Sequence, residues 1–288
     1  MEQFVTLTVN GVILGSVFAA FALTLVLIFR ATRIINFGQG AMAMFSGFLA
    51  LRTIEATGSW WLGLLVAIVS GFVIGALVER VIVRPVESGP EINAVIVTLG
   101  VFVGFVALAG ILFGNQFRGF PGAFSLQGFD LVAITPNDLF KLGAVVVALL
   151  VLVVLFQLTS LGLQMRAAAF GQEVARLLGV RVSNMLTLGW ALAGAFGALA
   201  GVLIASGSPI SPNYMDAVVV FGFVAAVLGG LDSFVGAVVG GLVLGLTSTY
   251  VSGYVSSALP TLAALAILVV VLLVRPGGLF SSSVARKV

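Results

Sequence analysis

Long runs of apolar residues separated by short polar turns dominate the 288-residue chain. A helix needs about 20 apolar residues to cross the hydrocarbon core of a bilayer, so each run predicts a membrane helix or much of one. The pattern predicts an all-α, polytopic membrane protein with about eight or nine transmembrane helices. The nine predicted segments are 9–29, 38–51, 61–83, 92–113, 139–158, 185–206, 217–231, 234–251 and 259–274.

Three of these segments, which begin at Gly38, Ala217 and Leu259, are short for a full crossing. Irregular backbone at membrane depth is tolerated only where it is buried in protein or lines a cavity. We therefore expect these segments to be tilted, broken or re-entrant within a single transmembrane domain that spans residues 1–288.

The basic residues are distributed unevenly between the two ends of the predicted helices. Nine crossings place ten of the 13 Lys and Arg residues on one side. Since cytoplasmic loops are enriched in these residues, the N-terminus is predicted outside and the C-terminus in the cytoplasm. The cytoplasmic set is Arg30, Arg33, Arg80, Arg84, Arg166, Arg176, Arg181, Arg275, Arg286 and Lys287, and the outside set is Arg52, Arg118 and Lys141.

The stretch 160–183 is the longest polar interruption in the second half of the chain and lies on the predicted cytoplasmic side. Its apolar residues follow helical spacing and end before Gly179, which predicts a short amphipathic helix. Such a helix either lies in the lipid interface, fits a groove on a soluble partner, or only covers the ends of neighbouring helices. The apolar stripe is Phe170, Val174, Leu177 and Leu178, and the charged residues are Arg166, Glu173, Arg176 and Arg181.

The longest predicted outside stretch is 114–138, which is rich in Gly, Pro and Phe. Its composition predicts ordered turns against the membrane surface. It serves either as a connecting loop or as a docking surface for an external protein. Elsewhere, glycines recur four residues apart, as in Gly71 and Gly75 or Gly100 and Gly104, and predict close helix packing within the chain or against a partner.

Composition excludes several classes of function. With 61% hydrophobic and 8% charged residues, the chain cannot cover a soluble surface. The net charge of +3 is scattered over helix ends, which does not indicate a nucleic-acid site. The absence of Cys and His removes the usual metal ligands, nucleophile and general base, so we expect neither catalytic nor metal-binding residues nor a cofactor in this chain.

The predicted membrane interior carries neutral polar residues and no ionisable side chain. A carboxylate that relays protons is therefore not expected, and active transport would need another source of energy. Hydroxyl and amide groups can line a path for a small neutral or zwitterionic solute, whereas Ser and Thr also commonly bond to helix backbone. The candidate path residues are Asn36, Gln39, Ser46, Asn93 and Thr98, with Thr247, Ser248 and Thr249 as further neutral positions.

Three stretches together resemble the LivH-type permease subunits of branched-chain amino-acid ABC importers. They are RIINFGQGAMAMFSGFLA, LGLQMRAAAFGQEVARLLGVRVSN followed by ALAGAFGALAGVL, and VVVFGFVAAVLGGLDSFVGAVVGGLVLG. The resemblance covers nearly the whole chain. The sequence departs from the family at Gln39, where His is usual, and at Ala41, where an acidic residue is common.

The resemblance implies that 160–183 is a cytoplasmic coupling loop that docks on an ATPase. It also implies two ATP-binding subunits, a second permease subunit, an external solute-binding protein and a location in a bacterial-type inner membrane. The chain has no G-x-x-x-x-G-K-[ST] motif, so ATP would be hydrolysed by the partner subunits. The positions that match the family's coupling pattern are Arg166, Glu173, Ala175, Leu178 and Gly179.

Two hypotheses from different classes follow. In the first, the chain is a permease subunit that forms part of a path for branched-chain or other small amino acids, with urea or short amides as the alternative solutes. In the second, it is a self-sufficient facilitator or channel for a small neutral solute, and the amphipathic helix lies on lipid. A membrane enzyme ranks behind both because no group of catalytic residues is present.

Overall fold

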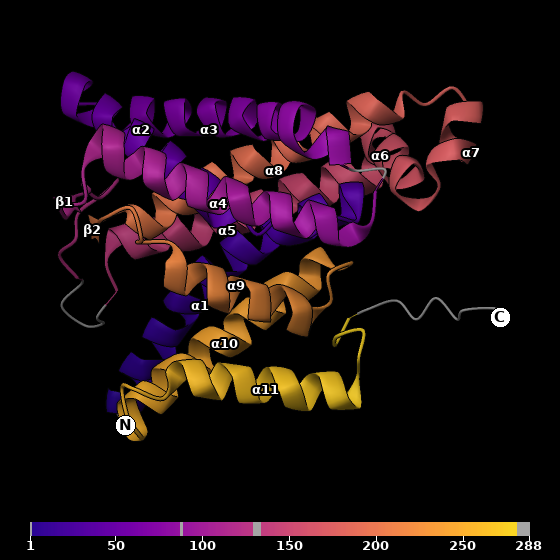
Figure 1. The fold of residues 1–288 in the computed structure, drawn as a ribbon. Helices are drawn as coiled ribbons and strands as arrows, with labels where there is room; N and C mark the ends of the chain where they lie inside the picture. Colours follow the sequence, from indigo (N-terminus) through magenta and orange to yellow (C-terminus); the bar gives the residue numbers. More distant parts are fainter. Residues whose placement is uncertain (1, 87–88, 129–133, 281–288) are drawn as a thin grey trace.

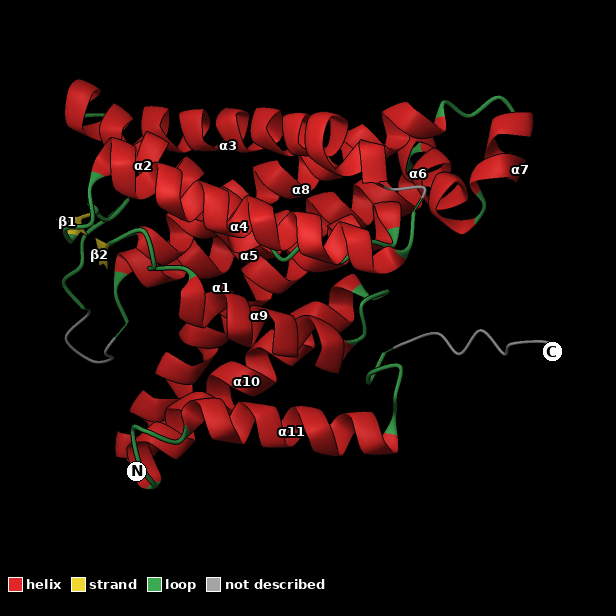
Figure 2. Ribbon diagram, viewed as in Figure 1, coloured by secondary structure: helices red, strands yellow, loops and turns green. Residues whose placement is uncertain are grey.

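The computed structural model describes residues 2–86, 89–128 and 134–280, and this part of the chain is mainly helical with very little strand (Figures 1 and 2). The helices are α1 (Glu2–Thr32), α2 (Gln39–Thr57), α3 (Trp60–Leu77), the π-helical η1 (Val78–Val83), the 3-10 helix η2 (Arg84–Val86), α4 (Glu91–Phe113), α5 (Pro136–Leu158), α6 (Ser160–Phe170), α7 (Gln172–Leu177), α8 (Val182–Ala205), α9 (Asp216–Gly229), α10 (Phe234–Tyr254) and α11 (Pro260–Val274).

Each of the nine predicted segments coincides with a helix, apart from a few residues at its ends. Six helices in the described part are long and apolar enough to cross a membrane. The predicted short segments at Ala217 and Leu259 form α9 and α11, of 14 and 15 residues. The segment at Gly38 is longer than expected, because α2 continues for 19 residues to Thr57. The prediction of a helical polytopic membrane protein is confirmed.

The ends of the helices gather at two ends of the molecule (Figure 1). At the first, here called the β end, β1 (Arg118–Gly119) pairs antiparallel with β2 (Pro209–Ile210). Trp60 donates from its indole to the carbonyl oxygen of Pro121 at 3.1 Å, which ties the start of α3 to the same loop. The predicted turns after Gly114 are therefore ordered as far as residue 128, while residues 129–133 of the stretch lie outside the described residues.

Tyr214 adds a polar contact near the β end, in the turn that precedes α9. Its hydroxyl lies 3.2 Å from the carbonyl oxygen of Gly201 on α8, to which it donates. Burial raises the pKa of this hydroxyl, so the group stays protonated and available as a donor. This contact holds the turn against α8.

The opposite end, here called the α7 end, carries α6 and α7 and the connections after α1, α3 and α9 (Figure 1). Helix α1 runs between the two ends through the centre of the molecule and packs on α8, α9 and α10. Most of its residues from Ser16 to Ile28 are buried, which places the core around its middle. The outer helices α3, α4, α5 and α11 expose long apolar faces, as helices in lipid do.

Most of the predicted glycine pairs lie in close helix contacts. A Cβ on Gly15 would lie 2.8 Å from the Cα of Leu242, where α1 crosses α10, and one on Gly71 would meet the backbone of Gly194, where α3 crosses α8. Only glycine permits this approach of two backbones. Gly100 and Gly104 are different: a Cβ on either would find no atom within 4 Å. This pair therefore makes no close helix contact within the chain, and its predicted packing would be against a partner.

Candidate functional site

The connection between α1 and α2 breaks regular helix where the neutral polar residues were predicted. Arg33 ends α1 with a φ of 61°, a left-handed conformation that residues with a side chain seldom adopt. Asn36 is fully buried, and its Oδ1 accepts from the backbone N–H of Gly38 at 2.9 Å. Its Nδ2 donates to Oε1 of Gln39 at 3.0 Å. These bonds replace the helix hydrogen bonds that the break removes.

Gln39 ties this break to the middle of α8. Its side chain is fully buried, and Nε2 donates to the carbonyl oxygen of Ala193 at 2.8 Å. Gly197 makes the approach possible, because a Cβ at that position would collide with Nε2 of Gln39. Ala193 is the twelfth of the 24 residues of α8, so the break lies at mid-depth in the helix bundle.

The other three predicted path residues fall into two groups. Thr98 of α4 is buried against the break, since a Cβ on Gly38 would lie 3.0 Å from its carbonyl oxygen, and its hydroxyl donates to Val95. Ser46 lies farther along α2 and donates to Met42 within the same helix. Asn93 is half-buried near the start of α4. The structure thus groups Asn36, Gln39 and Thr98, but not the other two.

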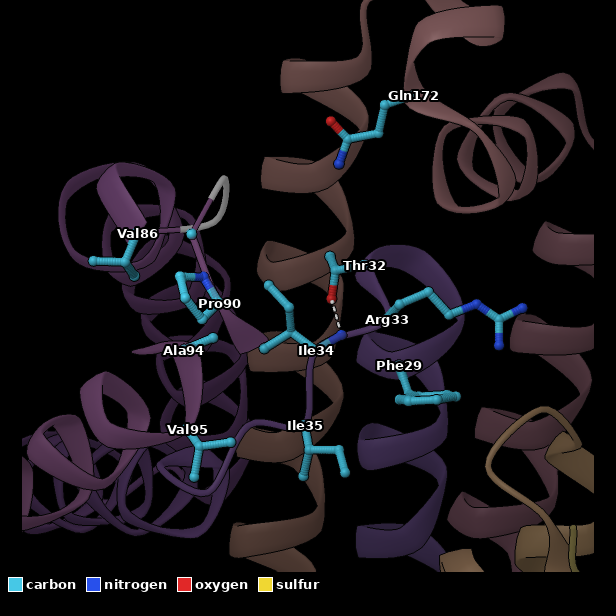
Figure 3. A pocket seen from close by; sticks show the side chains of 11 residues that line it. Phe29, Thr32, Arg33, Ile34, Ile35, Val86, Pro90, Ala94, Val95 and Gln172 are labelled. Atoms are coloured by element: carbon cyan, nitrogen blue, oxygen red, sulfur yellow. Dashed lines mark hydrogen bonds between the residues drawn. The ribbon is translucent and has the colours of Figure 1, made fainter. Parts of the chain in front are cut away.

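A pocket of about 300 Å³ lies on the α7 side of the break. Figure 3 shows Ile34 and Ile35 of the connection beside Pro90 and Val95, with Gln172 of α7 at the far rim. The pocket joins five elements: the end of α1, the α1–α2 connection, η2, the start of α4 and the start of α7. None of the five predicted path residues lines it. It is the place where the break, α4 and the 160–183 stretch meet.

The stretch 160–183 forms two helices and not one. Gly171, whose backbone is extended, separates α6 from α7, so Phe170 ends α6 and does not belong to the predicted amphipathic helix. α7 itself has only six residues. The apolar stripe still exists as a surface, because Phe170 and Leu177 are 87% and 88% exposed. The helices that carry these residues, α6 and α7, lie at the α7 end (Figure 1).

The predicted coupling residues play different structural parts. Glu173, Leu178 and Gly179 are exposed, and Gly179 has a φ of 83°, which ends the turn after α7. Arg166 is half-buried on α6 and donates to the carbonyl oxygen of Gly162 at 3.3 Å. Ala175 is buried in a small cluster that also contains Ala168 of α6 and Val182 and Leu186 of α8. It anchors α7 to its neighbours and is not available to a partner.

The structure contains an ionic network near the α7 end that the sequence did not predict. Glu79 lies in the π-helical η1 with a side chain only 2% exposed and accepts two hydrogen bonds of 3.0 Å from Arg84. Thr187 of α8 donates to the same carboxylate at 2.7 Å. Glu79 lies at the end of the predicted segment 61–83, as expected of an ionisable residue, but the burial of its side chain was not predicted. Acid and base five residues apart would be misaligned on an ordinary helix, and the wider π turn brings them together.

A family described as "Branched-chain amino acid transport system / permease component" has a sequence model that matches residues 7–274. The chain belongs to this permease family. Members of this family are the permease components of transport systems, and such a permease in general works with ATPase and solute-binding partners.

The permease resembles proteins from bacteria and archaea along nearly its whole length. It is 29% identical to the high-affinity branched-chain amino acid transport system permease protein LivH of Salmonella typhimurium, covering 97% of this chain and 96% of that protein. It is 28% identical to a probable LivH of Methanocaldococcus jannaschii, covering 94% and 90%. The fructose import permease protein FruF of Bifidobacterium longum is 26% identical and covers 84% of this chain and 70% of that protein.

Proposed function

We propose that this permease is one of two membrane subunits of an ATP-driven importer for branched-chain or other small apolar amino acids. The second membrane subunit is a different chain, and the protein acts as a transporter with no catalytic role of its own. The proposal is supported by the relatives named for branched-chain amino acid transport. The similarity to them extends over 94–97% of this chain and 90–96% of each relative. A path without fixed charge also suits a solute that is neutral overall.

The α7 end couples the permease to two ATPase subunits, which bind and hydrolyse ATP. The observation that carries this step is the exposed surface of α7. Leu177 and Leu178 are 88% and 77% exposed, beside the charged Glu173 and Arg176. A short helix with apolar anchors and a polar rim suits a groove on a soluble partner.

Movement of α7 reaches the centre of the molecule through α8. Ala175 fixes α7 against the start of α8, and Thr187 joins α8 to the carboxylate of Glu79 on η1. Farther along α8, the carbonyl of Ala193 holds Gln39 at the break. One rigid helix therefore links the docking surface to the residues that close the bundle at mid-depth, which is what a coupling element requires.

In this arrangement the α7 end faces the cytoplasm and the β end faces the solute-binding protein, in a bacterial-type inner membrane. The N-terminal end of α1 then lies outside. The basic residues Arg33, Arg84 and Arg176 at the α7 end support this orientation. The 114–128 loop, held by β1 and by Trp60, offers an ordered surface to the external protein.

Two other solute classes fit the same fold. Urea or short amides would suit a neutral path equally well, and the relative named for fructose import indicates that permeases of similar sequence act on chemically different solutes. A self-sufficient facilitator is favoured only if the exposed side chains of α7 lie on lipid. The two classes of mechanism differ in their need for ATP.

Reconstitution tests the proposal directly. The permease is co-expressed with an ATPase, a second permease and a binding protein from the same organism, and uptake of radiolabelled leucine, urea and fructose is measured in proteoliposomes with and without ATP. We expect leucine uptake that requires ATP and the binding protein. Leucine flux through the permease alone, without ATP, would establish the facilitator, and ATP-driven uptake of urea alone would replace the proposed solute.

A further inference from the structure

A second pocket, here called the outer pocket, lies toward the β end between α1, α9, α10 and α11. Its volume is about 450 Å³, within the range of about 300–1,000 Å³ that small-molecule sites occupy. It lies on the opposite side of the break from the pocket in Figure 3. Phe18 of α1 borders the outer pocket and Phe29 of the same helix borders the other. Because 11 residues of helix rise by roughly 16 Å, the two pockets lie at different depths along α1. Both pockets therefore approach the closed middle of the bundle from opposite ends.

The base of the outer pocket is apolar and formed by well-packed, buried side chains. Phe18 of α1 and Phe221 of α9 stack with ring centroids 4.7 Å apart and an angle of 10° between the rings. Both rings are at least nine-tenths buried. Leu14 and Val218 complete this wall. No charged side chain lines the pocket, so a ligand with a net charge would lose its hydration without gaining a counter-ion.

One polar group in this wall lacks a partner. Ser248 of α10 is 5% exposed, lines the pocket, and its Oγ makes no hydrogen bond. The adjacent hydroxyl of Thr249 behaves differently, because it donates to the carbonyl oxygen of Gly245 at 2.8 Å. A buried hydroxyl without a partner is unfavourable relative to a bonded one, and native proteins leave few such groups. A ligand that bonds to Ser248 would remove this disadvantage.

We infer that the outer pocket binds the transported solute on its way in, with the apolar side chain of a small amino acid against Phe18 and Phe221. One group of its zwitterionic end is bonded to Ser248, and the other stays hydrated on the exposed side of the pocket beside Ser252. This inference rests on the proposed function and names a binding site for its solute. A lipid acyl chain would fill the apolar wall but offers nothing to the hydroxyl. The pocket selects solutes that are small, neutral overall, apolar at one end and hydrogen-bonding at the other.

The absence of cysteine from this chain allows a direct test. In the complete transporter, Ser248→Cys places a single thiol of this chain in the pocket, and its alkylation by a small maleimide is followed on the permease. We expect L-leucine to slow the labelling at least threefold in a saturable manner, and arginine to have no effect. A rate that leucine leaves unchanged in a transporter that still imports leucine would overturn the inference and spare the proposed function. Slow labelling in every condition would show that a small solute does not reach this position from the pocket, which also overturns the inference.

Selectivity supplies a second measurement that does not depend on the thiol. Phe221→Ala enlarges the apolar wall and should shift the ratio of phenylalanine to leucine uptake at least tenfold toward phenylalanine. Ser248→Ala should raise the KM for leucine, whereas Ser70→Ala, whose hydroxyl donates to Ala67 within α3, should not. An unchanged uptake ratio in Phe221→Ala would contradict the inference. Failure of the unaltered transporter to import any amino acid would overturn both the proposed function and this site.

Discussion

Gln39 and Ala193 are joined by a hydrogen bond of 2.8 Å between the amide Nε2 of one and the carbonyl oxygen of the other, across 154 residues of sequence. Gln39 also accepts from Asn36, so a single side chain connects the break before α2 with the middle of α8. Replacement of Gln39 by Met keeps the length of the side chain and removes both bonds. Because Asn36 then keeps only a weak acceptor, Sδ of Met42 at 3.7 Å, we expect a loss of about 1–3 kcal/mol in the free energy of unfolding.

Thermal unfolding in mild detergent measures this change. Ser46→Ala is the matched control on the same helix, since that hydroxyl bonds only to Met42 one turn away and should contribute less. If Gln39→Met and Ser46→Ala lower the melting temperature equally, the amide does not hold α2 to α8.

The glycines of α10 and α4 predict opposite responses to the same substitution. A Cβ on Gly240 would collide with the carbonyl oxygen of Ala225 on α9, whereas one on Gly104 would meet no atom within 4 Å. Gly240→Ala should therefore destabilise the permease by about 1–3 kcal/mol through forced separation of the helices. Gly104→Ala should be neutral or stabilise it by up to about 1 kcal/mol, because Ala favours the helix. Melting temperatures of the two purified variants test the pair, and a destabilised Gly104→Ala would show that a partner covers α4.

These glycines also show what the sequence could predict. Hydrophobic run length places the nine helices because it depends on the bilayer and not on tertiary contacts. Spacing of four predicts a glycine stripe, but Gly100 and Gly104 repeat it with nothing packed against them. The three-dimensional arrangement of the helices decides which glycine stripes pack against another helix. The spacing of glycines along the sequence carries no information about that arrangement. The two-helix form of 160–183 likewise depends on the extended backbone of Gly171, which periodicity alone does not reveal.

Polarity identified Asn36 and Gln39 as unusual residues in an apolar setting, and the structure brings them together. Polarity could not predict that their side chains would bond to each other and to α8. The burial of Glu79 was not predicted for a related reason, because a charged side chain at a helix end can usually reach water. The π-helical turn of η1 instead directs it toward Arg84 and Thr187.

Glu79 should consequently matter for stability although it lies near the end of a span. Glu79→Gln removes the negative charge from a side chain that is 2% exposed and leaves Arg84, which is 31% exposed, without its counter-ion. Loss of one partner from a buried pair costs about 3–5 kcal/mol, and the partial exposure of Arg84 reduces our expectation to about 1–3 kcal/mol. Thermal unfolding at low and high salt measures the loss. Arg84→Lys should be nearly as damaging, because an ammonium cannot form the two parallel bonds to the carboxylate.

Glu173 provides the test of coupling at the α7 end, because it is exposed and no membrane helix depends on it. Glu173→Lys reverses a charge beside Arg176 on the surface proposed to dock on an ATPase. A charge reversed at a desolvated contact weakens binding by about 2–5 kcal/mol, so ATPase co-purification and ATP-driven uptake should both fall at least tenfold while membrane insertion is normal. Glu2→Lys, an equal change at the exposed start of α1, should affect neither quantity. Added positive charge would strengthen contact with anionic lipid, so normal ATPase binding and uptake in Glu173→Lys would assign α7 to the membrane surface.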